Sequence, residues 1–197
     1  AGVFTPQEGA KLVRQRGKIM AAALPEGTSG MAAVLNTEES VIAEVCAEVK
    51  EIGVCEIANY NCPGQIVISG QKEAVAAASE KLKARGARRV IPLQVSGAFH
   101  TSLLNEASVQ LREVLDTYAF GEEEIPVINN VSGKVETRDL REVLQEQICH
   151  SVHFTQSLQA MIDMGVELFI EIGTGHALRG FVRKTTKAVP FYHIDTT

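Results

Sequence analysis

One histidine of this sequence lies where a general base could act. His100 ends the segment 96–100, which follows a strand-like run and precedes a helical pattern. Open α/β sheets place their sites at such strand ends. A neutral imidazole, whose ordinary pKa is about 6.5, can take a proton from a hydroxyl and return it to a leaving thiol. Taken alone, the position also fits a histidine that only supports the fold, so the context has to decide.

A nucleophile to accompany this base is missing from the sequence. No serine stands at the centre of a G-x-S-x-G motif, the strained turn that exposes a nucleophile. The Ser-Gly steps at 29–30, 69–70 and 132–133 have the wrong spacing. The four cysteines lie in no such turn and form no C-x-x-C pair, which indicates reduced thiols and no metal site. They are Cys46, Cys55, Cys62 and Cys149.

An arginine of the first expected helix is a second candidate. Arg16 lies in the polar stretch 14–18. One interpretation is a solvated helix face, where exposed charges contribute little. The other is a planar guanidinium that holds a substrate carboxylate through two parallel charge-assisted hydrogen bonds. Spacing alone leaves both interpretations open.

The residues before His100 predict two units of structure. A capping box with proline at the first helical position, residues 5–8, begins a helix that we expect to reach about residue 23. Residues 31–95 follow the order strand, helix, strand, strand, helix, strand, which is typical of a ferredoxin-like βαββαβ domain. The expected elements are 31–35, a helix from 37, 55–60, 65–69, 72–85 and 89–95.

After His100 longer helices alternate with short, continuous apolar strands, which indicates a buried parallel sheet. We expect helices at 102–118, 140–149, 155–164 and from 177, strands at 126–131 and 167–172, and a tight turn at 173–175. The first helix fits this part of the chain. The sequence therefore predicts an α/β fold in which a small domain, 27–96, is inserted into a larger domain formed by 1–26 and 97–197.

Composition narrows the classes of partner. The 197 residues are 45% hydrophobic, enough to bury a core, and carry a formal net charge of -5. We expect no nucleic-acid or membrane partner, because no basic field is present and no apolar run reaches the roughly 20 residues of a membrane span. Without a signal peptide the expected location is cytoplasmic. The chain also opens on a helix start without an initiator Met, so we expect a piece of a longer protein.

Several short segments together carry a family resemblance that runs nearly end to end. In order they are AGVF and LVRQRG at 1–4 and 12–17, GMAAV at 30–34, ANYNCPGQIVISG at 58–70, AFH at 98–100, PVINNV at 126–131 and EIGTG at 171–175. Their order and separation resemble the malonyl-CoA:acyl-carrier-protein transacylase family and the acyltransferase domains of fatty-acid and polyketide synthases. The chain is similar to the C-terminal two-thirds of such proteins.

The resemblance implies both a fold and a reaction. The fold is an α/β-hydrolase-like large domain, here truncated at its N-terminus, with an inserted ferredoxin-like small domain. The reaction is ping-pong transfer: a serine in G-H-S-x-G takes the malonyl group from malonyl-CoA and passes it to the phosphopantetheine thiol of acyl carrier protein. Both substrates are thioester carriers, and no further cofactor and no metal are expected. Without the serine, the fragment alone is expected to be inactive.

The resemblance also assigns roles to residues of this sequence. His100 becomes the base, Arg16 the residue that holds the malonyl carboxylate, and Gln147 the residue whose backbone carbonyl orients His100, in place of the acid of a triad. Phe99 corresponds to an aromatic residue that goes with malonyl selectivity in related polyketide acyltransferases. The residues that line the cleft are Asn59, Asn61 and Gln65.

Two departures and two missing parts accompany these assignments. Cys62 stands where many relatives have serine, and Thr174 where they usually have proline; the sequence gives neither change a functional meaning. The serine turn and a G-Q-G oxyanion segment would lie upstream of Ala1, so that segment is expected as a further partner.

Other functions remain open from sequence. The chain could be the acyltransferase domain of a polyketide synthase, or a non-catalytic ferredoxin-like subunit that binds a partner chain holding the serine. An RNA-binding βαββαβ domain is disfavoured, because the strand 65–69 has no aromatic residue for stacking bases and the chain is acidic.

Overall fold

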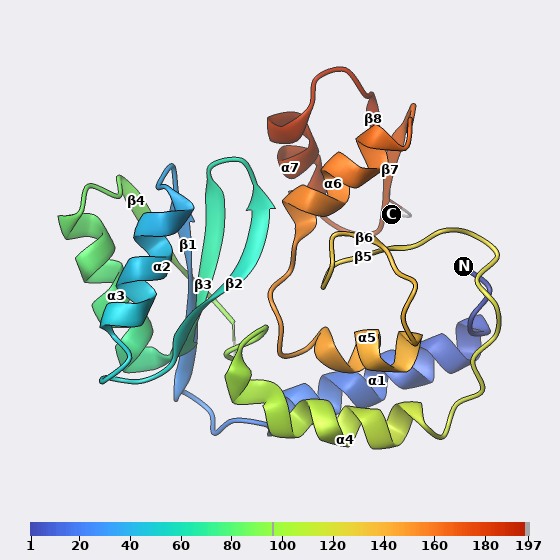
Figure 1. The fold of residues 1–197 in the computed structure, drawn as a ribbon, viewed down its shortest axis with the longest axis horizontal. Coiled ribbons are helices and arrows are strands. Elements are labelled where there is room, and N and C mark those ends of the chain that lie inside the picture. The colour runs from blue at the N-terminus through green and yellow to red at the C-terminus, as the bar shows by residue number, and fades with distance from the viewer. Residues whose placement is uncertain (96, 196–197) are drawn as a thin grey trace.

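A four-stranded sheet is the largest regular unit of the computed structural model, which describes residues 1–95 and 97–195. Its strands and the two helices between them are β1 (Ser29–Leu35), α2 (Glu39–Glu48), β2 (Cys55–Cys62), β3 (Gln65–Gln71), α3 (Lys72–Ala84) and β4 (Arg89–Leu93). Neighbouring strands are antiparallel in the order β2-β3-β1-β4. The order of helices and strands along the chain is the βαββαβ order that the sequence predicts, and α2 and α3 lie on one side of the sheet (Figure 1).

Both faces of this sheet are packed. Side chains alternate along a strand, so Ala32 and Val34 of β1 face α2 and α3, whereas Met31 and Ala33 face the other way. The first face joins a core with Ile42, Val45, Ile68 and Leu82. Gly70 of β3 permits a close crossing, because a Cβ there would lie 2.0 Å from the carbonyl oxygen of Val54. The second face of the sheet packs against Phe99, next to His100.

A helical layer lies beside the sheet and consists of α1 (Pro6–Ala22), α4 (Asn105–Leu115) and α5 (Leu140–Glu146), which run together in Figure 1. The predicted capping box is present, since Thr5 and Glu8 exchange hydrogen bonds at the start of α1. The helix expected at 102–118 is shorter: a 3₁₀ turn, η1 (Ser102–Leu104), precedes α4. Its core contains Leu12, Met20, Leu104, Leu111, Leu115 and Ile148.

The third group of elements differs most from the prediction. It contains α6 (Phe154–Asp163), β7 (Phe169–Ile172), α7 (Ala177–Thr185) and β8 (Phe191–Ile194), with β7 and β8 parallel. The strand expected at 126–131 does not join them. It forms only β5 (Ile128–Asn129), which pairs antiparallel with β6 (Lys134–Val135) in a hairpin.

The parallel pairing expected for this part of the chain is present in β7 and β8, but the expected burial on both faces is not found in the described residues. In β7 the exposed fractions of Ile170 and Ile172 are 51% and 76%, and only Phe169 enters the core with Leu158 and Val182. A continuous apolar run predicts burial on both faces, but β8 is the only strand that pairs with β7 in the described part of the chain. No helix among the described residues is long and apolar enough to cross a membrane.

A short segment before α6 joins the sheet to the rest of the molecule. Val152 lies alongside the edge strand β2, where its N–H donates to the Ala58 carbonyl and its carbonyl accepts from the Tyr60 N–H, both at 2.8 Å. The Ser151 hydroxyl donates to the Ile57 carbonyl at 2.6 Å. The segment between α5 and α6 is thus fixed against β2, and the same segment carries the residues that contact His100.

Candidate active site

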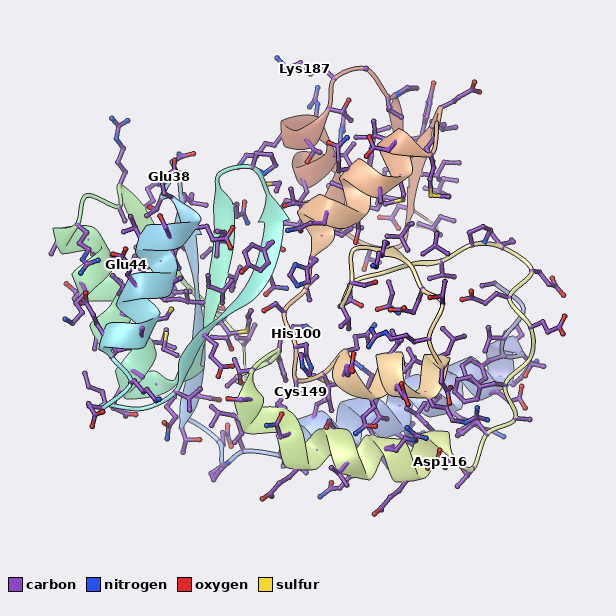
Figure 2. All side chains as sticks on the ribbon, in the orientation of Figure 1. Glu38, Glu44, His100, Asp116, Cys149 and Lys187 are labelled. Carbon is purple, nitrogen blue, oxygen red and sulfur yellow. The ribbon has the colours of Figure 1, made fainter. Side chains whose placement is uncertain are left out.

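His100 lies at the centre of the molecule, between the four-stranded sheet and α5 (Figure 2). Its φ angle is +61°, a left-handed conformation that is uncommon for a residue with a side chain. The backbone N–H donates to the Ile148 carbonyl at 3.2 Å, and the ring Nδ1 lies 2.9 Å from the Gln147 carbonyl oxygen. Backbone strain of this kind persists where surrounding contacts fix a residue, and it is frequent at functional sites.

The contact with Gln147 determines the tautomer of the His100 ring. A carbonyl oxygen can only accept, so Nδ1 carries the proton and donates it, which leaves the lone pair on Nε2. The backbone of His150 also lies close enough to the His100 ring to raise its pKa. Nε2 is therefore the atom that can act as a base.

The surroundings of His100 keep the ring neutral. Burial lowers the pKa of His100, the hydrogen bond to the Gln147 carbonyl raises it in part, and the positive charge of Arg16 lowers it again. A lowered pKa means that the imidazole is unprotonated at neutral pH, which is the state that general-base catalysis requires.

Arg16 is a half-buried cation beside this ring. It lies on α1 at the same face as Leu12 and Met20, because residues four apart share one side of a helix. Its Nε is buried and has no hydrogen-bond partner among the described residues, and burial lowers the pKa of the guanidinium. Buried donors are normally paired, so an orphaned guanidinium N–H indicates a position for an acceptor such as a carboxylate.

Two of the other residues expected at the site, Asn59 and Gln65, lie on the sheet face that packs against Phe99. Asn59 lies opposite Val67 across the β2–β3 pair, and Gln65 precedes Val67 by two positions, so both share its face. Asn61 lies at a second irregularity of β2, between Tyr60 and Cys62. All three amides are half-buried, and no hydrogen bond in the described residues joins them to His100 or Arg16.

A cavity of about 780 Å³ opens on one side of His100. It lies between α2 and β2 on one wall and the segment 149–151 on the other. Glu56 lies in this wall and accepts hydrogen bonds from the Ser102 N–H at 2.8 Å and the Ser102 hydroxyl at 2.6 Å, which fixes the start of η1 two residues after His100. Neither Arg16 nor Phe99 lines this cavity.

Comparison with known proteins decides the family. The model of the acyl transferase domain matches residues 1–193 of the 197. The chain belongs to the acyl transferase domain family. A malonyl CoA-acyl carrier protein transacylase of Bacillus subtilis is 43% identical over 190 residues, a match that covers 95% of this chain and 60% of that protein.

Solved acyl transferase structures agree with this assignment. A malonyl-CoA:acyl carrier protein transacylase from Xanthomonas oryzae superposes with a TM-score of 0.94 at 38% identity, over 97% of this chain and 62% of the other. A malonyl-transacylase in complex with a type II polyketide synthase acyl carrier protein gives 0.96 at 35% identity, over 100% and 64%. The mixed α/β fold is therefore shared, and the chain spans less than two thirds of the length of these relatives.

The acyl transferase structure thus brings some of the expected residues together and leaves others apart. One cluster contains His100, Gln147 and Arg16. Phe99, next to His100, packs against the four-stranded sheet. Two residues around this cluster were missed from the sequence: Glu56, which accepts hydrogen bonds from Ser102, and Asn130, whose Oδ1 accepts a hydrogen bond from the Gln147 side chain at 2.7 Å. Glu56 has no sequence signal as a single acid on a strand, whereas Asn130 lies in the PVINNV segment of the family resemblance.

Proposed function

We propose that this chain is part of a malonyl-CoA:acyl-carrier-protein transacylase, an acyltransferase that moves the malonyl group from coenzyme A to the phosphopantetheine thiol of acyl carrier protein in fatty-acid biosynthesis. The observation that carries the proposal is the proximity of a neutral, Nδ1-protonated His100 to Arg16, whose buried Nε has no hydrogen-bond partner among the described residues. A base and a carboxylate-binding cation side by side suit a substrate that has a thioester at one end and a carboxylate at the other.

The residues of this chain supply proton transfer and binding in that reaction. Nε2 of His100 takes the proton of an attacking serine and gives it to the sulfur of coenzyme A as the thiolate leaves; in the second half it takes the proton of the carrier thiol and returns one to the serine. The Gln147 carbonyl stabilises the charged imidazolium that forms in between. Arg16 holds the malonyl carboxylate and so places the thioester carbonyl near the base.

The remaining parts of the catalyst lie outside this sequence in our proposal. No G-x-S-x-G serine occurs in the 197 residues, so a further segment of the protein provides the nucleophile and part of the oxyanion hole. Acid–base and covalent catalysis need no metal and no cofactor, and we propose that none is used. We also propose a cytoplasmic location, where both thioesters would be available.

The fold supports the domain division expected from the family. The βαββαβ order and the strand order β2-β3-β1-β4 favour a ferredoxin-like small domain at 27–96, inserted into an α/β-hydrolase-like large domain that includes 1–26 and 97–197. In this arrangement the large domain carries Arg16, His100 and Gln147, and the small domain contributes Asn59, Asn61 and Gln65 to the cleft wall.

A second candidate function shares the same chemistry. One solved relative is bound to a type II polyketide synthase acyl carrier protein, so the carrier served by this protein could belong to polyketide synthesis instead. A non-catalytic subunit is the other alternative, and the buried Nε of Arg16, which has no hydrogen-bond partner among the described residues, argues against it, because a buried donor of a purely structural arginine would be paired.

The test restores the missing segment. The N-terminal segment of the Bacillus subtilis relative, joined ahead of Ala1, yields a chimera in which we expect transfer of radiolabelled malonyl from malonyl-CoA to phosphopantetheinylated acyl carrier protein. The 197-residue chain alone and a His100→Ala chimera serve as controls. Both should transfer malonyl far more slowly than the unchanged chimera or not at all. A folded chimera that binds malonyl-CoA and transfers nothing would refute the proposal, and comparison of fatty-acid and polyketide carriers would separate the two pathways.

A further inference from the structure

Gln147 contacts the site with both its main chain and its side chain. Its carbonyl accepts the Nδ1–H of His100 at 2.9 Å, and its Nε2 donates to the Oδ1 of Asn130 at 2.7 Å. Gln147 is the C-cap of α5, where carbonyls no longer have partners within the helix and the last turn readily frays. A carbonyl at such a position needs a second restraint if it is to hold an imidazole in one orientation.

The turn that carries Asn130 provides that restraint. Between β5 and β6, the Asn130 carbonyl accepts from the His153 N–H at 2.7 Å, and the Asn129 carbonyl accepts from the Gly133 N–H at 2.7 Å. Gly133 has φ +69°, and a Cβ there would lie 2.6 Å from the Cβ of Gln156 on α6. The turn is therefore held by its own backbone hydrogen bond and packs against α6. The backbone of Asn130 is fixed in this way, and its side chain extends from there to Gln147.

Other contacts at this end of α5 are weaker restraints. Arg138 forms ion pairs with Glu136 and Glu146, and the Arg138 side chain that the two pairs share is 41% exposed to solvent. Exposed ion pairs contribute little because water and salt screen them. The bond between Asn130 and Gln147 lies between two half-buried side chains, where an amide left without its acceptor carries a desolvation cost.

We propose that Asn130 is a positioning residue for the base: through the Gln147 amide it holds the carbonyl that keeps the proton on Nδ1 of His100 and leaves Nε2 free. This inference rests on the proposed function of His100 and extends it to the β5–β6 hairpin, from which no hydrogen bond in the described part of the chain reaches His100 directly. The restraint runs from the hairpin turn to Asn130, from Asn130 to Gln147, and from Gln147 to His100.

The first test needs no catalytic turnover and uses the 197-residue chain. Long-range ¹⁵N NMR reports which ring nitrogen of each histidine carries the proton, and a His100→Ala chain assigns the signal. We expect the Nδ1–H form in the unchanged chain. Asn130→Ala should lower the ratio of Nδ1–H to Nε2–H by about two- to tenfold, the range for one lost neutral hydrogen bond. An unchanged ratio would overturn the inference.

Three further variants separate positioning from general support of the fold. Gln147→Leu removes the amide and keeps the carbonyl, so it should match Asn130→Ala, and the double variant should be no worse than either alone. Asn130→Asp keeps an oxygen that accepts from the amide and should retain the Nδ1–H form. Asn129→Ala disturbs the same turn without removing the contact to Gln147. If Asn129→Ala shifted the tautomer as much as Asn130→Ala, the turn would merely support the fold and the inference would fail.

The second test uses the chimera that carries the serine segment. Asn130→Ala should lower kcat by about tenfold with an unchanged KM for malonyl-CoA, less than the roughly 100-fold that a 1 Å misplacement can cost, and Asn130→Asp should restore kcat. An equal rise in KM would indicate loss of structure instead. If the unchanged chimera transfers no malonyl, the proposed function fails by itself, while the NMR ratio still decides the role of Asn130.

Discussion

Replacing Arg16 by alanine removes a cation that the fold holds half-buried beside the base. Arg16 shares the inner face of α1 with Leu12 and Met20, and its Nε has no partner among the described residues. Arg14, two residues earlier on the same helix, is exposed. Arg14→Ala therefore removes the same charge and the same side-chain length from the outer face, which makes it the matched control.

The expected loss follows from the bonds that the guanidinium would make. A hydrogen bond to a charged group is worth about 1.5 to 3 kcal/mol, and about 1.4 kcal/mol is a factor of ten. Arg16→Ala should thus lower kcat/KM for malonyl-CoA by about 10- to 150-fold. Acetyl-CoA has no carboxylate for the guanidinium to hold, so its kcat/KM should change much less. Arg14→Ala should leave both values close to those of the unchanged protein.

The same substitution has a second effect, on the pH dependence. The charge of Arg16 lowers the pKa of His100, so its removal raises that pKa towards the ordinary value for histidine. The base acts only when it is neutral, and a higher pKa leaves more of it protonated at a given acidic pH. The acid limb of kcat/KM should therefore move to higher pH in Arg16→Ala. This shift applies to acetyl and malonyl transfer alike. The loss of carboxylate binding persists at pH values above the pKa of His100 in both the unchanged protein and the variant.

The assay is transfer from radiolabelled acetyl-CoA and malonyl-CoA to phosphopantetheinylated acyl carrier protein by the serine-bearing chimera, across about pH 5 to 8, where histidine titrates. The plateau above the acid limb isolates carboxylate binding from proton transfer. Equal losses for acetyl and malonyl on that plateau would show that Arg16 supports the fold only. A loss in Arg14→Ala as large as in Arg16→Ala would refute the reasoning from burial.

Three further outcomes are expected. In the chimera, His100→Ala should lower the rate of serine acylation by about 10²- to 10⁴-fold with little change in substrate binding, measured in a single turnover; near-normal rates at neutral pH would make His100 structural. Phe99→Ser should narrow the preference for malonyl over methylmalonyl, because a phenyl ring costs an added methyl group about 1 to 3 kcal/mol of overpacking, and kcat/KM for both thioesters would show an unchanged ratio if Phe99 had no part in selectivity. The 197-residue chain alone should form no malonyl ester on exposure to malonyl-CoA, so a stable adduct in its intact mass would contradict the assignment of the nucleophile to another segment.

Local patterns in the sequence were sufficient for α1 and for most elements of the four-stranded sheet and its two helices. The capping box at Thr5 and the short apolar run at 31–35 each act within a few residues, so they can be recognised without the tertiary fold. Residues 126–131 show the limit of that reasoning. The same apolar run fits a buried strand or a short hairpin, and only the turn at Asn129 to Gly133 and its packing on α6 decide between them.

The candidate site divides in the same way. His100 could be found because it follows a strand and has a titratable side chain, but its tautomer depends on a carbonyl 47 residues away in the sequence, at Gln147. A backbone carbonyl has no residue type, so spacing cannot reveal it, and only the family resemblance pointed to it. The contacts of Glu56 and Asn130 are long-range for the same reason, since ordinary polar residues become part of the site through folding alone.

The pairing of Val152 with β2 also protects the sheet from association with other chains. An edge strand offers free N–H and C=O groups to any passing strand, which is how sheets aggregate. At the β2 edge the Tyr60 N–H and the Ala58 carbonyl are already bonded to Val152. At the opposite edge β4 contains Pro92, which has no N–H to donate. An added strand would thus meet occupied groups on one side and a missing donor on the other, which disfavours pairing of this four-stranded sheet with a strand of another copy.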